Sequence, residues 1–191
     1  MSPVSSRRLR QSALVSLNGV VSTPLAWAGP YFGPGSAHHA LAVLQECGAF
    51  LMGRKTYDLF SRQWPEADGA YAAALNALPK YVFSSTLEVA HWTNTSVVRG
   101  DVAAAVATLK AETGADLLMY GHGQFGQTLV DAGLVDELTL TVVPVFVDGE
   151  PLFRPVAGRQ SWELLSAGPG DDPGLASLTY CPVAPSTDAA R

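Results

Sequence analysis

Charged residues and cysteines are both scarce in this chain of 191 residues. Only 15% of the residues are charged and 48% are hydrophobic, which excludes a disordered chain and favours a globular domain. The net charge of −5 argues against non-specific binding to nucleic acid, because such binding needs a basic surface. Two cysteines are too few for a disulfide framework, and Cys47 is expected to be a thiol of the core.

Long apolar runs are missing as well. No stretch approaches the roughly 20 residues that span a bilayer, and the first residues do not resemble a signal peptide. We therefore expect a cytoplasmic protein that does not associate with membranes. A single domain is predicted over residues 9–182, with flexible tails at 1–8 and 183–191. The clustered arginines Arg7, Arg8 and Arg10 are expected to be solvated.

The secondary structure is predicted from the spacing of apolar residues. Strands are expected at residues 9–17, 49–52, 81–83, 96–98, 116–120 and 138–142, followed by an antiparallel pair at 162–166 and 175–180. Helical patterns are expected at residues 36–44, 56–60, 71–78, 102–109 and 125–132. Ser36 and Asp101 are predicted to cap two of these helices. This alternation predicts an α/β fold, with a mixed, mainly parallel sheet flanked by helices and antiparallel C-terminal edge strands.

The stretch that organises the chain follows the expected strand at residues 116–120. That strand ends at Gly121-His122-Gly123, and a helical pattern then opens with Gln124 and Phe125. Glycine allows the backbone to come close to a ligand, and the first N–H groups of a helix lack intrahelical partners. The stretch therefore fits a phosphate site, although a strand, two glycines and a helix can also form an ordinary tight turn.

Three other expected strands end in groups that suit phosphate, namely Gly53-Arg54-Lys55-Thr56, Ser84-Ser85 and Arg99-Gly100. Cations are unfavourable at a helix N-terminus, so Arg54 and Lys55 favour an anion between them. Ligands of open α/β sheets bind at the carboxyl ends of the strands. One phosphate would not need four loops, whereas a dinucleotide with an additional ribose phosphate would. Each loop alone is also compatible with ordinary turn residues.

Several of these motifs together resemble the dihydrofolate reductase-like superfamily, and most closely the reductase domain of bacterial riboflavin biosynthesis and its stand-alone relatives. They are Ser16-Leu17-Asn18-Gly19, Met52 to Tyr57, Ser84-Ser85, and the glycine turn running on to Leu138. The resemblance covers about residues 9–152, and the fold is expected to continue to Tyr180.

The resemblance implies bound NADPH, with Arg54, Ser84 and Ser85 at the adenosine phosphate. Lys55 and Thr56 would lie near the pyrophosphate, and residues 121–125 along its other side. The predicted cofactor residues are Gly53, Arg54, Lys55, Thr56, Ser84, Ser85, Arg99, Gly121, His122, Gly123, Gln124 and Phe125.

The chain departs from the family pattern at two turns. His122 stands where the glycine turn usually has a second glycine, and either donates to a phosphate or caps the helix. Asn18 stands where the first turn usually carries aspartate, and it keeps the turn geometry without the charge.

Substrate binding is predicted for Asn18 and for four aromatic residues, Trp27, Tyr31, Phe32 and Trp64. The aromatic side chains either form an apolar wall for a flat heterocycle or close the core beneath a long loop, and both interpretations stay open.

Two other groups of residues attract attention without indicating a site. The pair Asp136-Glu137 is predicted to be structural, because it lies at the start of a strand, away from the proposed site. No metal site is expected at His38 and His39, because neighbouring residues on a helix point about 100° apart.

The sequence therefore predicts an NADPH-dependent reductase acting on a small heterocyclic (pyrimidine- or pterin-like) or carbonyl substrate. The alternative is a non-catalytic NADP(H)-binding protein that has lost the substrate site. No Asp or Glu precedes Glu46, so the first helix cannot supply the carboxylate that folate reduction needs, and dihydrofolate is expected to be a poor substrate. By resemblance we also expect a homodimer.

Overall fold

The computed structural model describes residues 6–152 and 160–183, which form one eight-stranded sheet. The strand order is β4-β3-β2-β5-β1-β6-β8-β7. The strands are β1 (Leu9–Ser16), β2 (Cys47–Gly53), β3 (Lys80–Phe83), β4 (Thr95–Val98), β5 (Asp116–Tyr120), β6 (Glu137–Val143), β7 (Trp162–Pro169) and β8 (Ala176–Pro182). Strands β1 to β6 pair in parallel, while β8 pairs antiparallel with both β6 and β7. The predicted fold class is confirmed.

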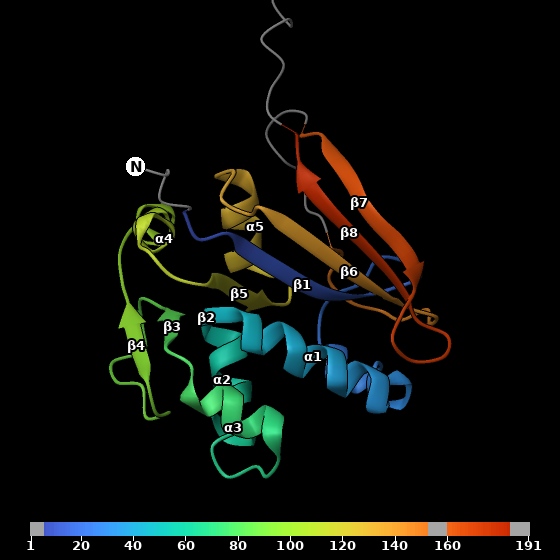
Figure 1. Cartoon of the computed structure of the whole chain (residues 1–191), viewed down its shortest axis with the longest axis horizontal. Helices are drawn as coiled ribbons and strands as arrows, with labels where there is room; N and C mark the ends of the chain where they lie inside the picture. Colours follow the sequence, from blue (N-terminus) through green and yellow to red (C-terminus); the bar gives the residue numbers. More distant parts are fainter. Residues whose placement is uncertain (1–5, 153–159, 184–191) are drawn as a thin grey trace, which may run out of the picture.

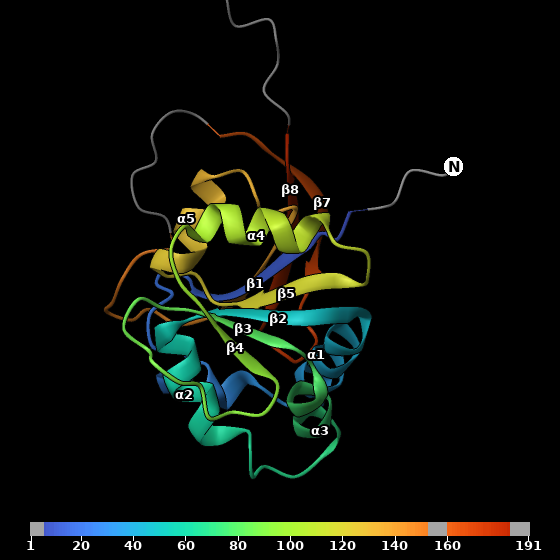
Figure 2. The ribbon, with the colours of Figure 1, turned by 90° about the vertical axis from the view of Figure 1, so that its left-hand side faces the viewer.

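Helices cover both faces of the sheet (Figure 1). On one face lie α1 (Pro34–Glu46), α2 (Arg54–Gln63) and α3 (Ala70–Ala77), and on the other lie α4 (Val102–Ala111) and α5 (Gln124–Asp131). Figure 2 shows the same layers from the side of β4. The long loop before α1 contains two short 3-10 turns, Pro24–Ala26 and Gly29–Tyr31. None of the helices in the described part of the chain is long and apolar enough to cross a membrane.

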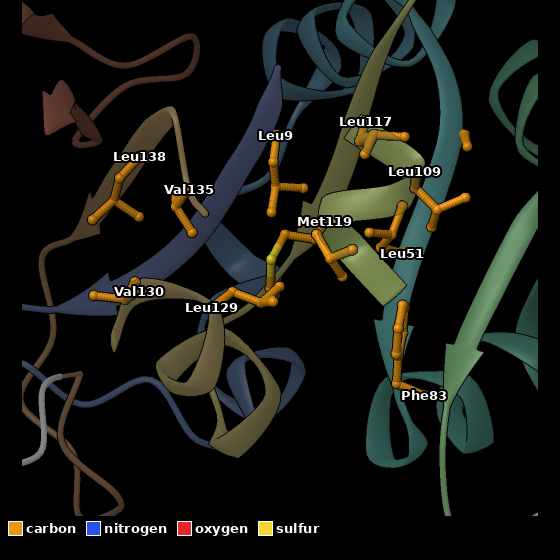
Figure 3. Close-up of a cluster of buried hydrophobic side chains, with 12 residues drawn as sticks. Leu9, Leu51, Phe83, Leu109, Leu117, Met119, Leu129, Val130, Val135 and Leu138 are labelled. Atoms are coloured by element: carbon orange, nitrogen blue, oxygen red, sulfur yellow. The ribbon is translucent and has the colours of Figure 1, made fainter. Parts of the chain in front are cut away.

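The core lies on both sides of the central strands β2 and β5. Leu51 and Met119 face α4 and α5, in the cluster drawn in Figure 3. Phe50 and Leu118 face the other layer of helices. Central parallel strands are buried on both faces, which explains why their sequences are continuous apolar runs. Cys47 is buried in the second cluster, as expected of a core thiol, and this burial raises its pKa to about 11.

The start of α1 differs from the prediction that Ser36 caps this helix. The helix begins at Pro34, and the N–H groups of Gly33, Gly35 and Ser36 donate to the carboxylate of Asp172, at 2.7, 3.1 and 2.8 Å. Asp172 lies in the turn between β7 and β8. Proline suits the first helical position because its missing N–H would have no helical partner there. The cap thus comes from a distant segment of the chain.

Two of the three arginines near the N-terminus are less solvated than expected, since Arg7 is buried and Arg10 is partly buried, whereas Arg8 is exposed. Arg7 is only 7% exposed, and its Nε donates to the carbonyl oxygen of Ala115 at 2.7 Å. The backbone N–H of Arg8 donates to Asp116 at 2.9 Å, and its side chain forms an ion pair with the same carboxylate. Residues 7 and 8 therefore belong to the folded domain and not to the predicted tail.

The pair Asp136-Glu137 has the structural role that we predicted. Asp136 accepts a hydrogen bond from the N–H of Leu9 at 2.7 Å and pairs with Lys110. Glu137 pairs with Arg10, with 3.0 Å between Oε1 and Nε. These contacts join the amino-terminal ends of β1 and β6, the opposite edge of the sheet from the proposed site.

Candidate functional site

The glycine motifs after β2 and β5 meet at the carboxyl edge of the sheet. A Cβ added to Gly53 would lie only 3.1 Å from the Cβ of Phe125. The start of α2 therefore packs directly against the first turn of α5, and a side chain at position 53 would have to push Phe125 aside. The structure brings together two motifs that are about 70 residues apart in the sequence.

Neither of these two helices has a side-chain cap. Gly53 and Gly123 are the N-cap residues of α2 and α5, and the first turn of each helix contains no acidic residue. The first N–H groups of a helix have no intrahelical acceptor and form the positive end of its dipole. Two such ends side by side are suited to bind an anion. Gly121, just before α5, has a φ of +82°, a conformation that favours glycine.

Three predicted cofactor residues gather around the loop that follows β3. Arg54 Nη1 lies 3.4 Å from Thr86 Oγ1. Ser84 Oγ accepts a hydrogen bond from the N–H of Leu87 at 3.1 Å, and Arg99 Nη2 donates to the carbonyl oxygen of Leu87 at 2.6 Å. Ser84 and Arg99 thus shape this loop, while the neighbouring Ser85 is exposed on it.

The two cations at the start of α2 each have a carboxylate neighbour. Arg54 Nε donates to both oxygens of Asp58, at 2.8 and 2.9 Å, one helical turn further on. Lys55 is 94% exposed, with its Nζ 3.8 Å from Glu150 Oε1. The Asp58 contact explains how α2 tolerates a cation near its N-terminus without a bound anion. The Arg54 side chain remains 41% exposed at the edge of the site.

His122 lies beneath the glycine turn, and its imidazole contacts side chains of β1 and α5. Its side chain is buried, with 6% exposed, and Nδ1 is 2.8 Å from Gln11 Nε2. Nε2 is 3.4 Å from Gln127 Oε1. The imidazole therefore faces β1 and the inner side of α5, and not the open N-terminus of that helix.

The two residues that follow Gly123 differ in position. Gln124 is exposed at the first position of α5. Phe125 stacks on Phe83 with ring centroids 4.7 Å apart, so its ring is part of the core beneath the site.

Asn18 uses its amide group to hold a neighbouring loop. Its Nδ2 donates to the carbonyl oxygen of Val147 at 2.8 Å, and its Oδ1 accepts from the N–H of the same residue at 3.2 Å. Ser16 Oγ also donates to this Oδ1 at 2.7 Å. An aspartate here would place an oxygen against the Val147 carbonyl, which explains physically why this turn carries an amide.

Of the two interpretations of Trp64, packing in the core fits the structure better than a wall for the substrate. Its ring packs against Tyr71 and Phe60, with centroids 4.8 and 6.1 Å apart. Tyr120, at the end of β5, belongs to the same cluster, with its ring centroid 6.4 Å from that of Phe60. The sequence did not predict this position. Burial and the neighbouring Tyr71 raise the pKa of Tyr120. The only signal in the sequence is a tyrosine at the last position of an apolar strand.

The aromatic residues of the long loop before α1 also differ in how far they are buried. Trp27 and Tyr31 pack against a small apolar cluster around Val143, at the end of β6. Phe32 remains 44% exposed. Of the four aromatic residues predicted to bind substrate, Phe32 is the one that is exposed, while the other three are partly buried.

No three His, Cys, Asp or Glu side chains in the described ranges come together in a way that could hold a metal ion. The candidate site is thus built from backbone N–H groups, hydroxyls and guanidinium groups.

A mainly parallel sheet with this strand order, and with glycine turns opening α2 and α5, has the dihydrofolate reductase-like fold. Residues 7–169 match the RibD C-terminal domain family, and the chain belongs to that family.

The chain is also similar to individual proteins and solved structures. The chain is 28% identical over 130 residues to the uncharacterized protein YyaP of Bacillus subtilis, covering 64% of this chain and 68% of that protein. Its structure resembles a putative riboflavin biosynthesis protein from Shewanella sp. PV-4, with a TM-score of 0.74, 22% identity, and coverage of 93% of this chain and 99% of that one. It also resembles dihydrofolate reductase from Enterococcus faecalis complexed with NADP(H), with a TM-score of 0.65, 14% identity, and coverage of 93% and 97%. At these identities the two structures show the shared fold.

Proposed function

We propose that this protein is an NADPH-dependent reductase that transfers hydride to a small heterocyclic (pyrimidine- or pterin-like) or carbonyl substrate. The observation that carries the proposal is the pair of helix N-termini at Gly53 and Gly123, which lie side by side without caps. This arrangement suits the pyrophosphate of a dinucleotide. It also fits the Enterococcus faecalis relative, whose structure contains NADP(H).

The residues around the paired termini suggest how each part of NADPH is held. The N–H groups at the start of α2 and α5 would bind the pyrophosphate. The exposed part of the Arg54 guanidinium, together with Ser85 on the loop after β3, would meet the additional ribose phosphate. A planar guanidinium is well suited to a phosphate dianion. Bound NADPH supplies the hydride, so the chain itself has to position and shield the two reactants.

The substrate would lie on the α1 side of the carboxyl edge, near Phe32 and the end of β5. The first turn of α1 contains no acidic residue, and the capping carboxylate of Asp172 already accepts three backbone N–H groups. A hydrogen bond from the Ser36 side chain, together with these backbone contacts, lowers the pKa of Asp172 to about 2 from an ordinary value of 3.8, so Asp172 is a poor proton donor. We therefore propose that neutral heterocycles or carbonyl compounds are reduced, and that dihydrofolate is turned over poorly.

The test begins with the cofactor. Calorimetric titration of the purified protein should show tight NADPH binding and much weaker NADH binding. Loss of absorbance at 340 nm should then identify an acceptor among pyrimidine, pterin and carbonyl compounds. Absence of binding by either cofactor would refute the dinucleotide site, and efficient dihydrofolate turnover would refute the inference about α1.

A second function is supported by how the polar and aromatic groups are used. The amide of Asn18 is engaged by Val147, and the ring of Trp64 is packed in the core. A non-catalytic NADP(H)-binding protein would show these features if it had lost its substrate site. NADPH binding without any acceptor-dependent loss at 340 nm would favour this alternative.

We also propose that the protein is a homodimer. The edge strand β7 exposes two adjacent leucines, Leu164 at 50% and Leu165 at 54%. An apolar, unpaired sheet edge is a common site of association. Light scattering that gives a mass near 20.1 kDa at micromolar concentration would contradict the dimer.

A further inference from the structure

A short chain of hydrogen bonds lies directly behind the glycine turn. Gln11, in the middle of β1, is 1% exposed, and its Nε2 donates to the carbonyl oxygen of Gly121 at 2.9 Å. The same Nε2 is 2.8 Å from His122 Nδ1. On the other side of the ring, Nε2 of His122 is 3.4 Å from Gln127 Oε1, and Gln127 Nε2 donates to Asp131 at 2.9 Å.

The direction of these hydrogen bonds follows from Gly121. Its carbonyl oxygen can only accept, so the Gln11 atom that faces it must be the amide nitrogen. That nitrogen is a donor, and His122 Nδ1 must therefore be its acceptor. The ring proton is then carried by Nε2 and points toward Gln127 Oε1. The tautomer of His122 is assigned from this network.

Glycines in the turn and in α5 leave room for this chain of hydrogen bonds. A Cβ on Gly126 would lie 2.9 Å from Gln11 Nε2 and 3.2 Å from His122 Nδ1, so this position in α5 leaves room for both side chains. Gly121 takes its positive φ of +82° while its own N–H donates to the carbonyl oxygen of Ser12 at 2.8 Å. Both peptide groups of the turn residue Gly121 are thus tied to β1.

Stability alone does not explain a glutamine at position 11. Its Oε1 is buried and accepts no hydrogen bond from any described residue. A buried, unsatisfied amide oxygen is unfavourable, and an apolar side chain at this position would avoid it. What Gln11 provides is the pair of contacts from Nε2 to the turn. Groups that lower stability in this way are typical of functional sites.

We propose that His122 is a positioning residue for the cofactor turn. Its ring is anchored from behind by Gln11, and it holds the turn so that the N–H groups at Gly123 and at the start of α5 face outward. This inference rests on the proposed NADPH site, and it assigns His122 no contact with phosphate.

The first arm of the test needs no cofactor. Hydrogen exchange of the free protein, followed by mass spectrometry, compares wild type with His122→Ala. We expect the amide of Gly121, whose N–H donates to the carbonyl oxygen of Ser12, to exchange at least tenfold faster in the variant, while the peptides of α4 stay unchanged. Unchanged exchange in the turn would overturn the proposal, whatever NADPH does.

The second arm measures NADPH affinity together with melting temperature. His122→Ala should weaken NADPH about tenfold, which corresponds to the loss of one buried hydrogen bond. His122→Asn should recover most of the affinity, because its Oδ1 can accept from Gln11 where Nδ1 did. The double variant Gln11→Leu/His122→Leu should keep its melting temperature within a few degrees while its NADPH affinity falls, because it replaces both polar groups together.

The outcomes separate the alternatives. A direct phosphate contact would make His122→Asn as weak as His122→Ala and leave exchange in the turn unaffected, and this would refute positioning. Unchanged affinity in His122→Ala would also refute it. No NADPH binding by wild type would refute the proposed function itself, and the positioning role with it. His91→Asn, an exposed histidine before β4, is the matched control and should bind NADPH normally.

Discussion

Helices α1 and α4 begin differently from α2 and α5. The first two start beneath a carboxylate, with Asp172 accepting from three N–H groups of α1 and Asp101 Oδ1 accepting from Ala104 N at 3.1 Å in α4. The other two start at Gly53 and Gly123, without a side-chain cap. Both of these helices follow the central strands directly, at the edge where the phosphate motifs meet.

The difference shows where this chain leaves hydrogen-bonding capacity for a ligand. A carboxylate cap satisfies the free N–H groups and the helix dipole, and it would repel a phosphate at the same place. Glycine at an N-cap costs only a few tenths of a kcal/mol relative to the best capping residues. Helix α3 also begins at a glycine, Gly69, but it follows a loop and no strand. The open termini that matter are those at the ends of strands.

The largest effect is expected when the uncapped helix α5 is given a carboxylate cap. In Gly123→Asp the new side chain has room, because no atom lies within 4 Å of a Cβ built there and the φ is −119°. We expect NADPH affinity to fall about a hundredfold, since a like charge close to the pyrophosphate costs a few kcal/mol. The melting temperature should stay constant or rise slightly. Calorimetry and thermal unfolding measure the two effects.

Gly123→Asn is the matched control for this variant, because asparagine caps a helix as well as aspartate does but carries no charge. It should bind NADPH far better than Gly123→Asp. Equal losses in the two variants would show that volume, and not charge, is what the turn excludes.

The second prediction concerns Arg54, one of the two cations at the uncapped N-terminus of α2. Arg54→Ala should weaken NADPH by roughly ten- to a hundredfold, because a hydrogen bond to a charged group contributes about 1.5–3 kcal/mol. NADH, which lacks the additional phosphate, should be affected little. The loss should shrink at high salt, since a partly exposed pair is screened. Titrations with both cofactors at two salt concentrations measure this.

Asp58→Asn is the comparison for Arg54→Ala, because it removes the intrahelical carboxylate partner of Arg54 and leaves the guanidinium in place. It should bind NADPH at least as tightly as wild type. If Arg54→Ala weakened both cofactors equally, Arg54 would belong to the pyrophosphate or to the structure of α2.

The third prediction concerns the capped helix α4. Asp101→Ala should destabilise the protein by about 1 kcal/mol, the usual contribution of an N-cap, and lower its melting temperature by about 2–4 °C. NADPH affinity should change far less than in Arg54→Ala, because the carboxylate of Asp101 is engaged by the N–H of Ala104 in its own helix. A loss of affinity comparable to that of Arg54→Ala would contradict the division between capped and open helices.

The smallest effect is expected at Asp172 and appears mainly in acid. Hydrogen bonds from Ser36, Gly33 and Gly35 lower its pKa to about 2, from an ordinary value of 3.8. Between these two pH values the unfolded chain binds more protons, so the stabilising contribution is complete above pH 3.8 and is lost as the pH falls toward 2. Asp172→Asn should therefore reduce stability at neutral pH and flatten its decline between pH 4 and 2. Chemical denaturation of both proteins across this pH range measures the free energy of unfolding. Parallel curves of stability against pH for the two proteins would contradict the capping role of Asp172.

Much of the fold could be predicted from the sequence because its signals are local. The strand at residues 116–120 was bounded correctly by an apolar run and a glycine, and Asp101 was correctly predicted to cap α4. The prediction for Ser36 was wrong, because the acceptor that satisfies the start of α1 lies on Asp172, in a turn at the far end of the chain.

Lys80 gives a second example of what local patterns miss. It is 1% exposed, and its Nζ donates to the carbonyl oxygens of Leu75, Asn76 and Leu78 at 3.0, 3.0 and 2.7 Å. Its ammonium thus closes the C-terminal end of α3. A lysine beside a short apolar run does not show that it will be buried, since only the packing of α3 against β3 decides it.

By itself the sequence determined where the central strands β2 and β5 end and where glycine opens a helix, because apolar periodicity and the freedom of glycine act over a few residues. The tertiary structure alone decided which polar groups are already engaged. Asn18 holds Val147, His122 faces Gln11, and Asp172 caps α1. Each of these contacts joins segments that are more than 100 residues apart, and such contacts depend on strand order and register, which no local pattern specifies.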